Sequence, residues 1–296
     1  MPAALPLRHF LLALAVVAVW GTNFVVIKLA LGHLPPLLFA ALRFTLALFP
    51  ALFFLPRPTV GWRNLALYGV LIGVGQFGLL YLAINGHISP GIASLVVQTQ
   101  VFFTIGLSMR MNGERVQPFQ WFALALATAG IANIGMHTDG TTTVLGLVMI
   151  LGAALSWAGG NIAAKEGKPS NMLAYVVWSS AYAVPPLFVL SYVFEGGDAI
   201  VTGLRDASWA TWAAVAWQSW GNSLFGYAAW GWLLARHPAA TITPMALLVP
   251  VFGMGASSWW LGESLPAWKL VAAALVMGGL AVNLLWPTIR RRLARQ

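Results

Sequence analysis

Cysteine is absent from the 296 residues, and charged residues are scarce, at 8% of the chain. The absence of cysteine excludes disulfides, thiolate chemistry and cysteine-ligated metal sites. The scarcity of charge excludes an ordinary water-soluble surface, because 59% of the residues are hydrophobic. Lipid must therefore be the solvent for most of this protein.

The sequence signatures of common membrane and soluble enzymes are missing as well. There is no HExxH metal pair, no GxSxG nucleophile elbow and no Walker A loop. The five histidines stand near the ends of apolar segments, too dispersed for a metal site: His9, His33, His87, His137 and His237. We therefore expect no enzyme, no cofactor and no metal, and a membrane enzyme remains an alternative without a motif to support it.

Apolar stretches of about 20 residues, the length at which an α-helix crosses the hydrocarbon core, follow one another along the chain. Turn-rich pieces separate them, and only the connection at 195–208 is long enough to hold structure of its own. The pattern predicts an all-α integral membrane protein with ten transmembrane helices, at residues 10–31, 37–55, 64–86, 91–110, 118–136, 144–165, 172–194, 209–234, 241–261 and 267–287.

The net charge of +9 would suggest nucleic acid in a soluble protein, but here the basic residues stand at the ends of apolar segments. If the N-terminus is cytoplasmic, 12 of the 16 basic residues fall on the cytoplasmic side: Arg8, Arg57, Arg63, Arg110, Arg115, Lys165, Lys168, Arg236, Arg290, Arg291, Arg292 and Arg295. This bias predicts cytoplasmic termini and an even number of spans, in a multi-pass protein of a bacterial inner membrane. The expected partners are the lipid bilayer and a small-molecule substrate, not nucleic acid, and the oligomeric state stays open, with a monomer plausible.

The two halves of the chain are related in sequence. Residues 91–131 can be laid without a gap on 240–280, and the matches pair Gly113-Glu114 with Gly262-Glu263, Gly130 with Gly279, Trp20 with Trp157, and Lys28 with Lys165. Any two apolar helices look alike, but matched turns and spacings in the same order weaken that alternative. Because five is odd, we predict two inverted five-helix repeats, residues 1–140 and 141–296. This arrangement is typical of secondary transporters with a substrate site near the midplane.

Polar side chains inside a membrane tend to face the bundle interior or a water-filled cavity. With two deep tryptophans that the repeat relates, they predict the substrate-binding residues Trp20, Asn23, Arg43, Gln76, Tyr81, Gln98, Gln100, Trp157, Asn161 and Tyr227. The alternative for each Asn or Gln is a hydrogen bond between helices. In a regular helix Gln98 and Gln100 lie about 200° apart, so they are not expected to face one cavity together.

The charged residues near the membrane interior have two interpretations. Arg43 follows Pro36 by seven residues, about 10 Å below the outer interface, and either binds a substrate carboxylate or ties helix ends together through their carbonyls. Lys28 is expected to snorkel to the same interface. All seven acidic residues lie at helix ends or in loops, and Glu114 and Glu263 are expected to anchor neighbouring helices.

Four strings carry a family resemblance: AVWGTNFVVIK at 18–28, PPLLFAALRF at 35–44, NGHISPGIASLVVQTQVFFTIG at 85–106 and LLVPVFG at 247–253. They resemble EamA-type transporters of the drug/metabolite transporter superfamily, nearest to bacterial exporters of amino acids and related metabolites. The resemblance covers nearly the whole chain and implies ten helices, a basket-like inverted repeat and a central cavity. Many relatives carry a proline where this sequence has Gln100-Val101, which leaves the choice of substrate open.

These observations favour a secondary transporter that exports aromatic and other neutral amino acids and related small metabolites by alternating access. The alternative is a drug or nucleotide-sugar carrier of the same superfamily. A cationic-drug antiporter would need a buried acid in an early helix, and a nucleotide-sugar carrier would need clustered cations in its cavity. The sequence supplies neither.

Overall fold

A computed structural model describes residues 5–112, 117–137 and 140–293, and this part of the chain is built from helices without a β-strand. The first half contains α1 Leu7–Ala30, α2 Pro36–Leu48, α3 Ala51–Phe54, α4 Trp62–Val70, η1 Leu71–Gly78, α5 Leu79–Ile84, α6 Pro90–Val96, η2 Val97–Thr99, α7 Gln100–Asn112 and α8 Pro118–Met136. The second half contains α9 Val144–Gly167, α10 Met172–Phe194, α11 Gly197–Asp206, α12 Trp209–Ala216, η3 Trp217–Phe225, α13 Gly226–Arg236, α14 Ala239–Ile242, η4 Thr243–Leu247, α15 Leu248–Leu261 and α16 Ala267–Leu293.

Nine helices in the described ranges are long and apolar enough to cross a membrane. A further continuous helix joins α12, η3 and α13, and η3 places Gln218, Ser219 and Asn222 in its middle, which lowers its hydropathy. With this helix, the described residues hold a counterpart for each of the ten predicted spans. The long connection after α10 forms α11, so it does hold structure of its own.

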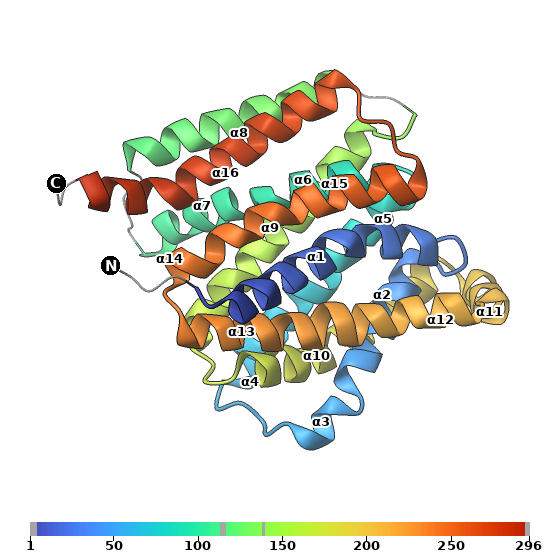
Figure 1. Ribbon diagram of the computed structural model, residues 1–296. Helices are drawn as coiled ribbons and strands as arrows, with labels where there is room; N and C mark the ends of the chain where they lie inside the picture. The colour runs from blue at the N-terminus through green and yellow to red at the C-terminus, as the bar shows by residue number, and fades with distance from the viewer. Residues whose placement is uncertain (1–4, 113–116, 138–139, 294–296) are drawn as a thin grey trace.

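The helices lie side by side in one bundle, with α1 beginning and α16 ending at the same end of it (Figure 1). We call this end the terminal side, and α11 lies at the opposite side. An even number of crossings is consistent with this arrangement of α1 and α16. Because each half crosses five times, the second half begins on the side opposite to the first and is inverted relative to it.

Contacts between the halves follow this inversion. The second helix of each half pairs with its counterpart, α2 with α10, and so does the fifth, α8 with α16. The first helix of one half, α1, packs on α15 and α13, while its counterpart α9 packs on α7, η1 and α5. The α8 and α16 pair lies along one edge of the bundle (Figure 1).

Glycines allow the closest of these contacts. A Cβ atom on Gly21 of α1 would lie 2.6 Å from the carbonyl oxygen of Val249 in α15. A Cβ atom on Gly253 of α15 would overlap Ser94 of α6. Only glycine lets these backbones approach so closely. Both glycines belong to the strings on which the family resemblance rests.

The carboxylate of Glu263 joins α15 to α6 on the side opposite the termini. Its Oε1 accepts hydrogen bonds from Ser89 Oγ at 2.5 Å and Lys269 Nζ at 2.9 Å, and its Oε2 accepts from the backbone N–H of Gly91 at 3.1 Å. An acid is favourable there because the first N–H groups of α6 have no partner within the helix. The prediction that Glu263 anchors a neighbouring helix is confirmed, whereas Glu114 lies outside the described residues.

Two further bonds join helix ends on that side. Glu195, after α10, accepts hydrogen bonds from the backbone N–H groups of Leu37 at 2.6 Å and Leu38 at 3.0 Å, at the beginning of α2. Lys28, expected to snorkel, is half-buried and donates to the carbonyl oxygen of Ile84 at 3.2 Å, at the end of α5. The side opposite the termini is therefore held together by hydrogen-bonded charged groups.

Replacing Glu263 by alanine should destabilise the protein, because Lys269, only 1% exposed, would lose its ion-pair partner. We expect the free energy of unfolding to fall by about 3–5 kcal/mol, measured as a lower thermal midpoint in detergent. Glu166→Ala, at an exposed position near the end of α9, is the matched control and should leave the midpoint unchanged. Equal midpoints for Glu263→Ala and wild type would contradict the anchoring role.

Candidate functional site

A cavity of about 390 Å³ lies between helices of both halves. Its wall combines aromatic rings with side-chain amides, and no described residue that lines it carries a charge. The rings are Trp20, Phe24, Tyr68, Phe77, Trp157, Tyr227 and Trp230, and the amides are Asn23, Gln76, Gln98, Gln100, Asn161 and Asn222. Such a wall suits a small ligand with one polar end and an apolar or aromatic body.

Eight of the ten residues predicted from the sequence line this cavity: Trp20, Asn23, Gln76, Gln98, Gln100, Trp157, Asn161 and Tyr227. Arg43 and Tyr81 do not line it. They are buried behind the wall, at 1% and 0% exposure, and connect to it through hydrogen bonds. Within the described residues, Arg43 donates to the hydroxyls of Tyr81 and Ser223, not to a helix-end carbonyl, and it does not line the cavity. It therefore has neither of its two expected positions.

The cavity extends toward the terminal side of the bundle. Its lining includes Met172, the first residue of α10, Thr243, the first residue of η4, and Leu284, near the end of α16. Successive helices alternate in direction, so these three positions lie on the side where α1 begins. The opposite side is the one held by Glu195 and Glu263.

Gln98 and Gln100 both line the cavity, so the prediction that they could not face it together was wrong. The reason is the 3₁₀ turn η2, which contains Gln98 and ends immediately before Gln100. In a regular α-helix residues two apart are separated by about 200°, which is about 160° measured the shorter way around. A 3₁₀ helix turns about 120° per residue, so the same two residues are only about 120° apart the shorter way around. The irregular turn thus brings a second amide to the wall.

Helical irregularities occur in matching positions of the two halves. The third crossing of each half contains a π-helical segment, η1 and η3, and the fourth contains a 3₁₀ segment, η2 and η4. The superposition of 91–131 on 240–280 lays η2 on the end of η4. All four segments contribute lining residues. Irregular turns of this kind are frequent at functional sites, where they direct polar groups inward.

The indole of Trp20 is held across the boundary between the halves. Its Nε1 donates a hydrogen bond to the backbone carbonyl oxygen of Asn222 at 3.1 Å, in the π-helical η3. Gly226 gives the ring room, since a Cβ atom there would overlap the indole nitrogen. The rings of Tyr227 and Trp230 lie beside it, with centroids 6.1 and 5.2 Å away. These contacts give Trp20 a defined orientation in the wall.

A hydrogen-bonded chain runs from Arg43 to the wall. Arg43 Nη1 donates to the hydroxyl of Tyr81 at 3.3 Å, and the Tyr81 hydroxyl donates to Gln218 Oε1 at 3.0 Å. Gln218 Nε2 then donates to Asn23 Oδ1 at 2.6 Å, and Asn23 lines the cavity. Arg43 Nη2 also donates to the hydroxyl of Ser223.

A second group of polar side chains lies at the cavity, around Asn161 and Gln100. Asn161 Nδ2 donates to Gln100 Oε1 at 2.7 Å and to Thr104 Oγ1 at 3.2 Å. This pairing leaves the Gln100 amide nitrogen and the Asn161 amide oxygen for other partners. Gln76 Oε1 is buried and has no partner in the described part of the chain. Because Gln76 lines the cavity, this oxygen can accept a hydrogen bond from a polar group of a ligand.

Sequence reasoning missed four aromatic residues of the wall, Phe24, Tyr68, Phe77 and Trp230. The tyrosine had a usable signal, because its hydroxyl needs a polar neighbour inside a membrane. The prediction also left out Asn222, which lines the wall, and Gln218, which hydrogen-bonds to Asn23. Both had the same signal as the chosen amides, since they are polar residues in the middle of a span. The two phenylalanines had no signal, because lipid-facing and cavity-facing Phe look alike in a sequence.

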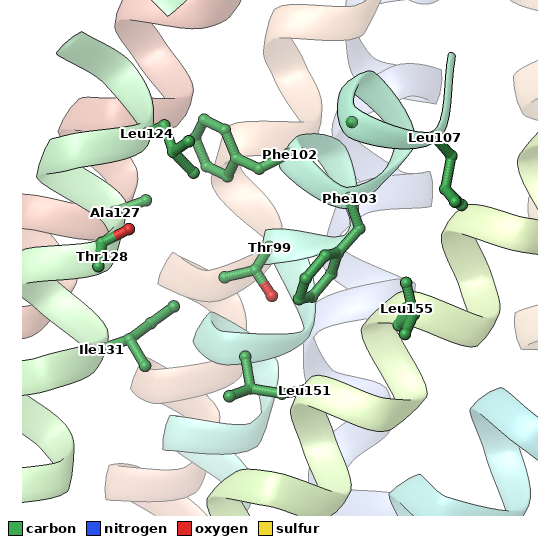
Figure 2. Close-up of a pocket in the computed structure, with 11 residues that line it drawn as sticks. Thr99, Phe102, Phe103, Leu107, Leu124, Ala127, Thr128, Ile131, Leu151 and Leu155 are labelled. Atoms are coloured by element: carbon green, nitrogen blue, oxygen red, sulfur yellow. The ribbon is translucent and has the colours of Figure 1, made fainter. Parts of the chain in front are cut away.

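A second hollow, of about 520 Å³, lies between α7, α8 and α9 and is almost wholly apolar (Figure 2). Phe102 and Phe103 enter it from α7, Leu151 and Leu155 from α9, and Ile131 is one of several residues from α8. It lacks the side-chain amides of the central cavity. The central cavity is therefore the candidate site. Within the described residues no three His, Cys, Asp or Glu side chains come together as metal ligands.

Comparison with known proteins adds independent findings. The chain matches the EamA-like transporter family twice, over residues 7–136 and 144–285. It is 40% identical over 291 residues to a probable amino-acid metabolite efflux pump of Salmonella typhimurium, covering 95% of this chain and 96% of the relative. It is 39% identical to a protein described in the same words from Escherichia coli K12, covering 92% of this chain and 93% of the relative.

One solved crystal structure of another protein has the same fold. It superposes with a TM-score of 0.61, covers 94% of this chain and 96% of its own, and shares 18% sequence identity. Identity at this level supports a likeness of fold alone. The helix arrangement described above is therefore found in a protein of quite different sequence.

The natural absence of cysteine allows a direct test of cavity access. Single replacements Asn161→Cys and Ala246→Cys, both in the wall, should react with a charged, water-soluble thiol reagent in detergent. Ser180→Cys, at a position 2% exposed between helices, should react at least about tenfold more slowly, because attack by the thiolate needs access. Unfolding should make all three react alike. Equal rates in the folded protein would contradict a water-filled cavity.

Proposed function

This chain belongs to the EamA-like transporter family, and from that membership we propose that it exports neutral amino acids, aromatic ones included, and related small metabolites. The observation that carries the proposal is the central cavity, whose wall offers amides for the polar groups of an amino acid and seven aromatic rings for its side chain. Two relatives at about 40% identity are described as probable amino-acid metabolite efflux pumps, which supports the same substrate class.

We propose transport by alternating access, with the two halves rocking about the cavity. The cavity extends to the terminal side, while Glu195 and Glu263 join helices on the other side. This difference between the two sides supports a conformation open on one side only. The paired irregular segments η1 with η3 and η2 with η4 are the places where the helices have the least regular hydrogen bonding, and they supply hinges in both halves.

The proposed division of the chain into halves at residues 1–140 and 141–296 agrees with the two family matches, which end at 136 and begin at 144. Each half would hold one five-helix repeat. The charge pattern supports both termini in the cytoplasm and therefore a cavity open to the cytoplasm in this conformation. A cavity that loads from the cytoplasm is the state an exporter needs for its substrate.

No observation favours the alternative substrates. The described lining residues include no carboxylate to pair with a cationic drug and no cluster of cations to bind a nucleotide diphosphate. The volume of about 390 Å³ suits a single amino acid better than a nucleotide sugar.

Purified protein in liposomes should accelerate the exchange of labelled phenylalanine and leucine. Trp157→Ala removes a ring from the wall and should slow phenylalanine more than leucine, by roughly three- to tenfold, because aromatic pairs contribute beyond their buried area. Trp259→Ala is the matched control, since this tryptophan is 86% exposed at the end of α15, and it should leave both rates unchanged. Rates equal to those of protein-free vesicles across a broad amino-acid panel would reject the proposed function.

Reporters fused to either end of the chain should both be active in the cytoplasm, as an even number of spans and the basic bias require. A reporter that folds only in the cytoplasm and one that is active only in the periplasm give opposite readouts for each end. Activity of the periplasmic reporter at one end only would contradict the inverted-repeat topology, because ends on opposite sides of the membrane require an odd number of crossings.

A further inference from the structure

We propose that Arg43 sets the charge selectivity of the cavity. Its buried positive charge, through Tyr81 and Gln218, makes Asn23 the binding point for a substrate carboxylate and excludes ligands of net positive charge. This inference rests on the proposed function and specifies which part of an amino acid the cavity recognises. Arg43 is then a positioning residue, because it does not line the cavity.

The positive charge of Arg43 is buried, and no ion pair balances it within the residues that the structure describes. Its side chain is 1% exposed, and a guanidinium stays protonated in proteins. Its nitrogens donate to the neutral hydroxyls of Tyr81 and Ser223. In the described part of the chain no carboxylate forms an ion pair with it. A buried charge without a partner of opposite charge is unfavourable on stability grounds alone, so its presence calls for a functional explanation.

The direction of the hydrogen-bonded chain follows from Arg43. A guanidinium only donates, so the Tyr81 oxygen must accept from it, at 3.3 Å. The Tyr81 proton is then directed to Gln218 Oε1, and Gln218 presents its amide N–H to Asn23 Oδ1. With its oxygen engaged, Asn23 turns its NH₂ donors to the cavity that it lines. The series of hydrogen bonds therefore ends in N–H donors at the cavity. A carboxylate can accept hydrogen bonds from these donors, and an ammonium group cannot.

The charge also acts on the cavity through space. The Arg43 guanidinium carbon lies 3.8 Å from the centroid of the Phe77 ring, and Phe77 lines the cavity. One ring therefore separates the charge from the ligand space. At an effective dielectric constant of about 20, a like charge 8 to 10 Å away weakens binding by roughly tenfold or more. A carboxylate gains from the same field.

These two effects select for the carboxylate end of a neutral amino acid. The carboxylate would bind at Asn23, and an aromatic or aliphatic side chain would lie among the rings of the wall. A ligand with the same side chain and amine but no carboxylate would lose the Asn23 contact and meet the repulsion of Arg43. An anionic ligand without a free amine would keep the Asn23 contact.

The test uses competition against labelled phenylalanine in proteoliposomes, at a mildly acidic pH that keeps an α-amine protonated. The competitors are phenylalanine, its N-acetyl derivative, which is an anion, and its amide, which is a cation. If the protein transports a different neutral amino acid but not phenylalanine, the three competitors are that amino acid, its N-acetyl derivative and its amide. We expect the amino acid to compete best, the N-acetyl derivative less well and the amide least, weaker than the amino acid by at least about tenfold.

Asn23→Asp tests the inference by a gain of binding, which a misfolded protein cannot give. It replaces donors by an acceptor carboxylate, so the amide should compete at least about tenfold better than in wild type and phenylalanine worse. Asn23→Ala is the matched control: it removes the donors without adding charge, so phenylalanine should bind more weakly and the amide should gain nothing. Arg43→Gln should reduce the discrimination against the amide, whereas Arg43→Lys, which keeps the charge, should retain most of it.

The outcomes separate the inference from the function. Transport of no amino acid by wild type would reject the proposed function itself. Transport of phenylalanine with equal competition by its amide would leave the function standing and overturn the inference. An Asn23→Asp protein that transports phenylalanine with an unchanged order of competitors would also overturn it. A purely structural role for Arg43 would lower phenylalanine and amide binding together and leave their ratio unchanged, which would contradict the role proposed here.

Discussion

Within hydrocarbon, a backbone N–H or C=O group must find its partner inside the protein, and this constraint decides where the helices of this chain can be irregular. Regular helices such as α1 and α9 line part of the central cavity, and all four irregular segments, η1, η2, η3 and η4, reach it as well. Side chains take up groups that the irregular turns release. Trp20 donates to the carbonyl oxygen of Asn222, and Ser223 donates to that of Gln218. In the described part of the chain, every π or 3₁₀ segment therefore contributes to the cavity wall.

The same constraint explains how much of the fold was predictable from the sequence. Apolar runs and breakers indicate where a helix crosses, so spans such as 118–136 and 172–194 were predicted with the bounds that the structure has. Charge at helix ends was also predictable in kind, because an acid after a Gly in a turn has unpaired N–H groups within reach. Glu263 fulfils that expectation at the start of α6. Its exact partners, Ser89 and Lys269, required the packing of three helices.

The site was less predictable, because hydropathy indicates the depth of a residue but not the direction in which it points. The rule that polar residues face inward found the amides of the wall, yet it could not separate Asn23, which meets the cavity, from Arg43 and Tyr81, which lie one layer behind. A regular helical wheel also failed for Gln98 and Gln100, because it assumes a constant rotation per residue that η2 does not keep. Direction depends on contacts between residues far apart in the sequence, such as Arg43 with Ser223.

The position of Arg43 couples the stability of the bundle to the electrostatics of the cavity. Its guanidinium joins α2 to η3 through Ser223 and lies against the ring of Phe77, and its backbone oxygen accepts a hydrogen bond from Ser219 at 2.8 Å. A lysine would supply a compact, strongly hydrated charge without the planar fork that reaches two hydroxyls at once. An apolar residue would relieve the buried charge but would leave Tyr81 free to reverse its hydrogen bond, and with it the polarity of Gln218 and Asn23. The cation is therefore best understood as the group that keeps the amides of the wall in one orientation, at some cost in stability.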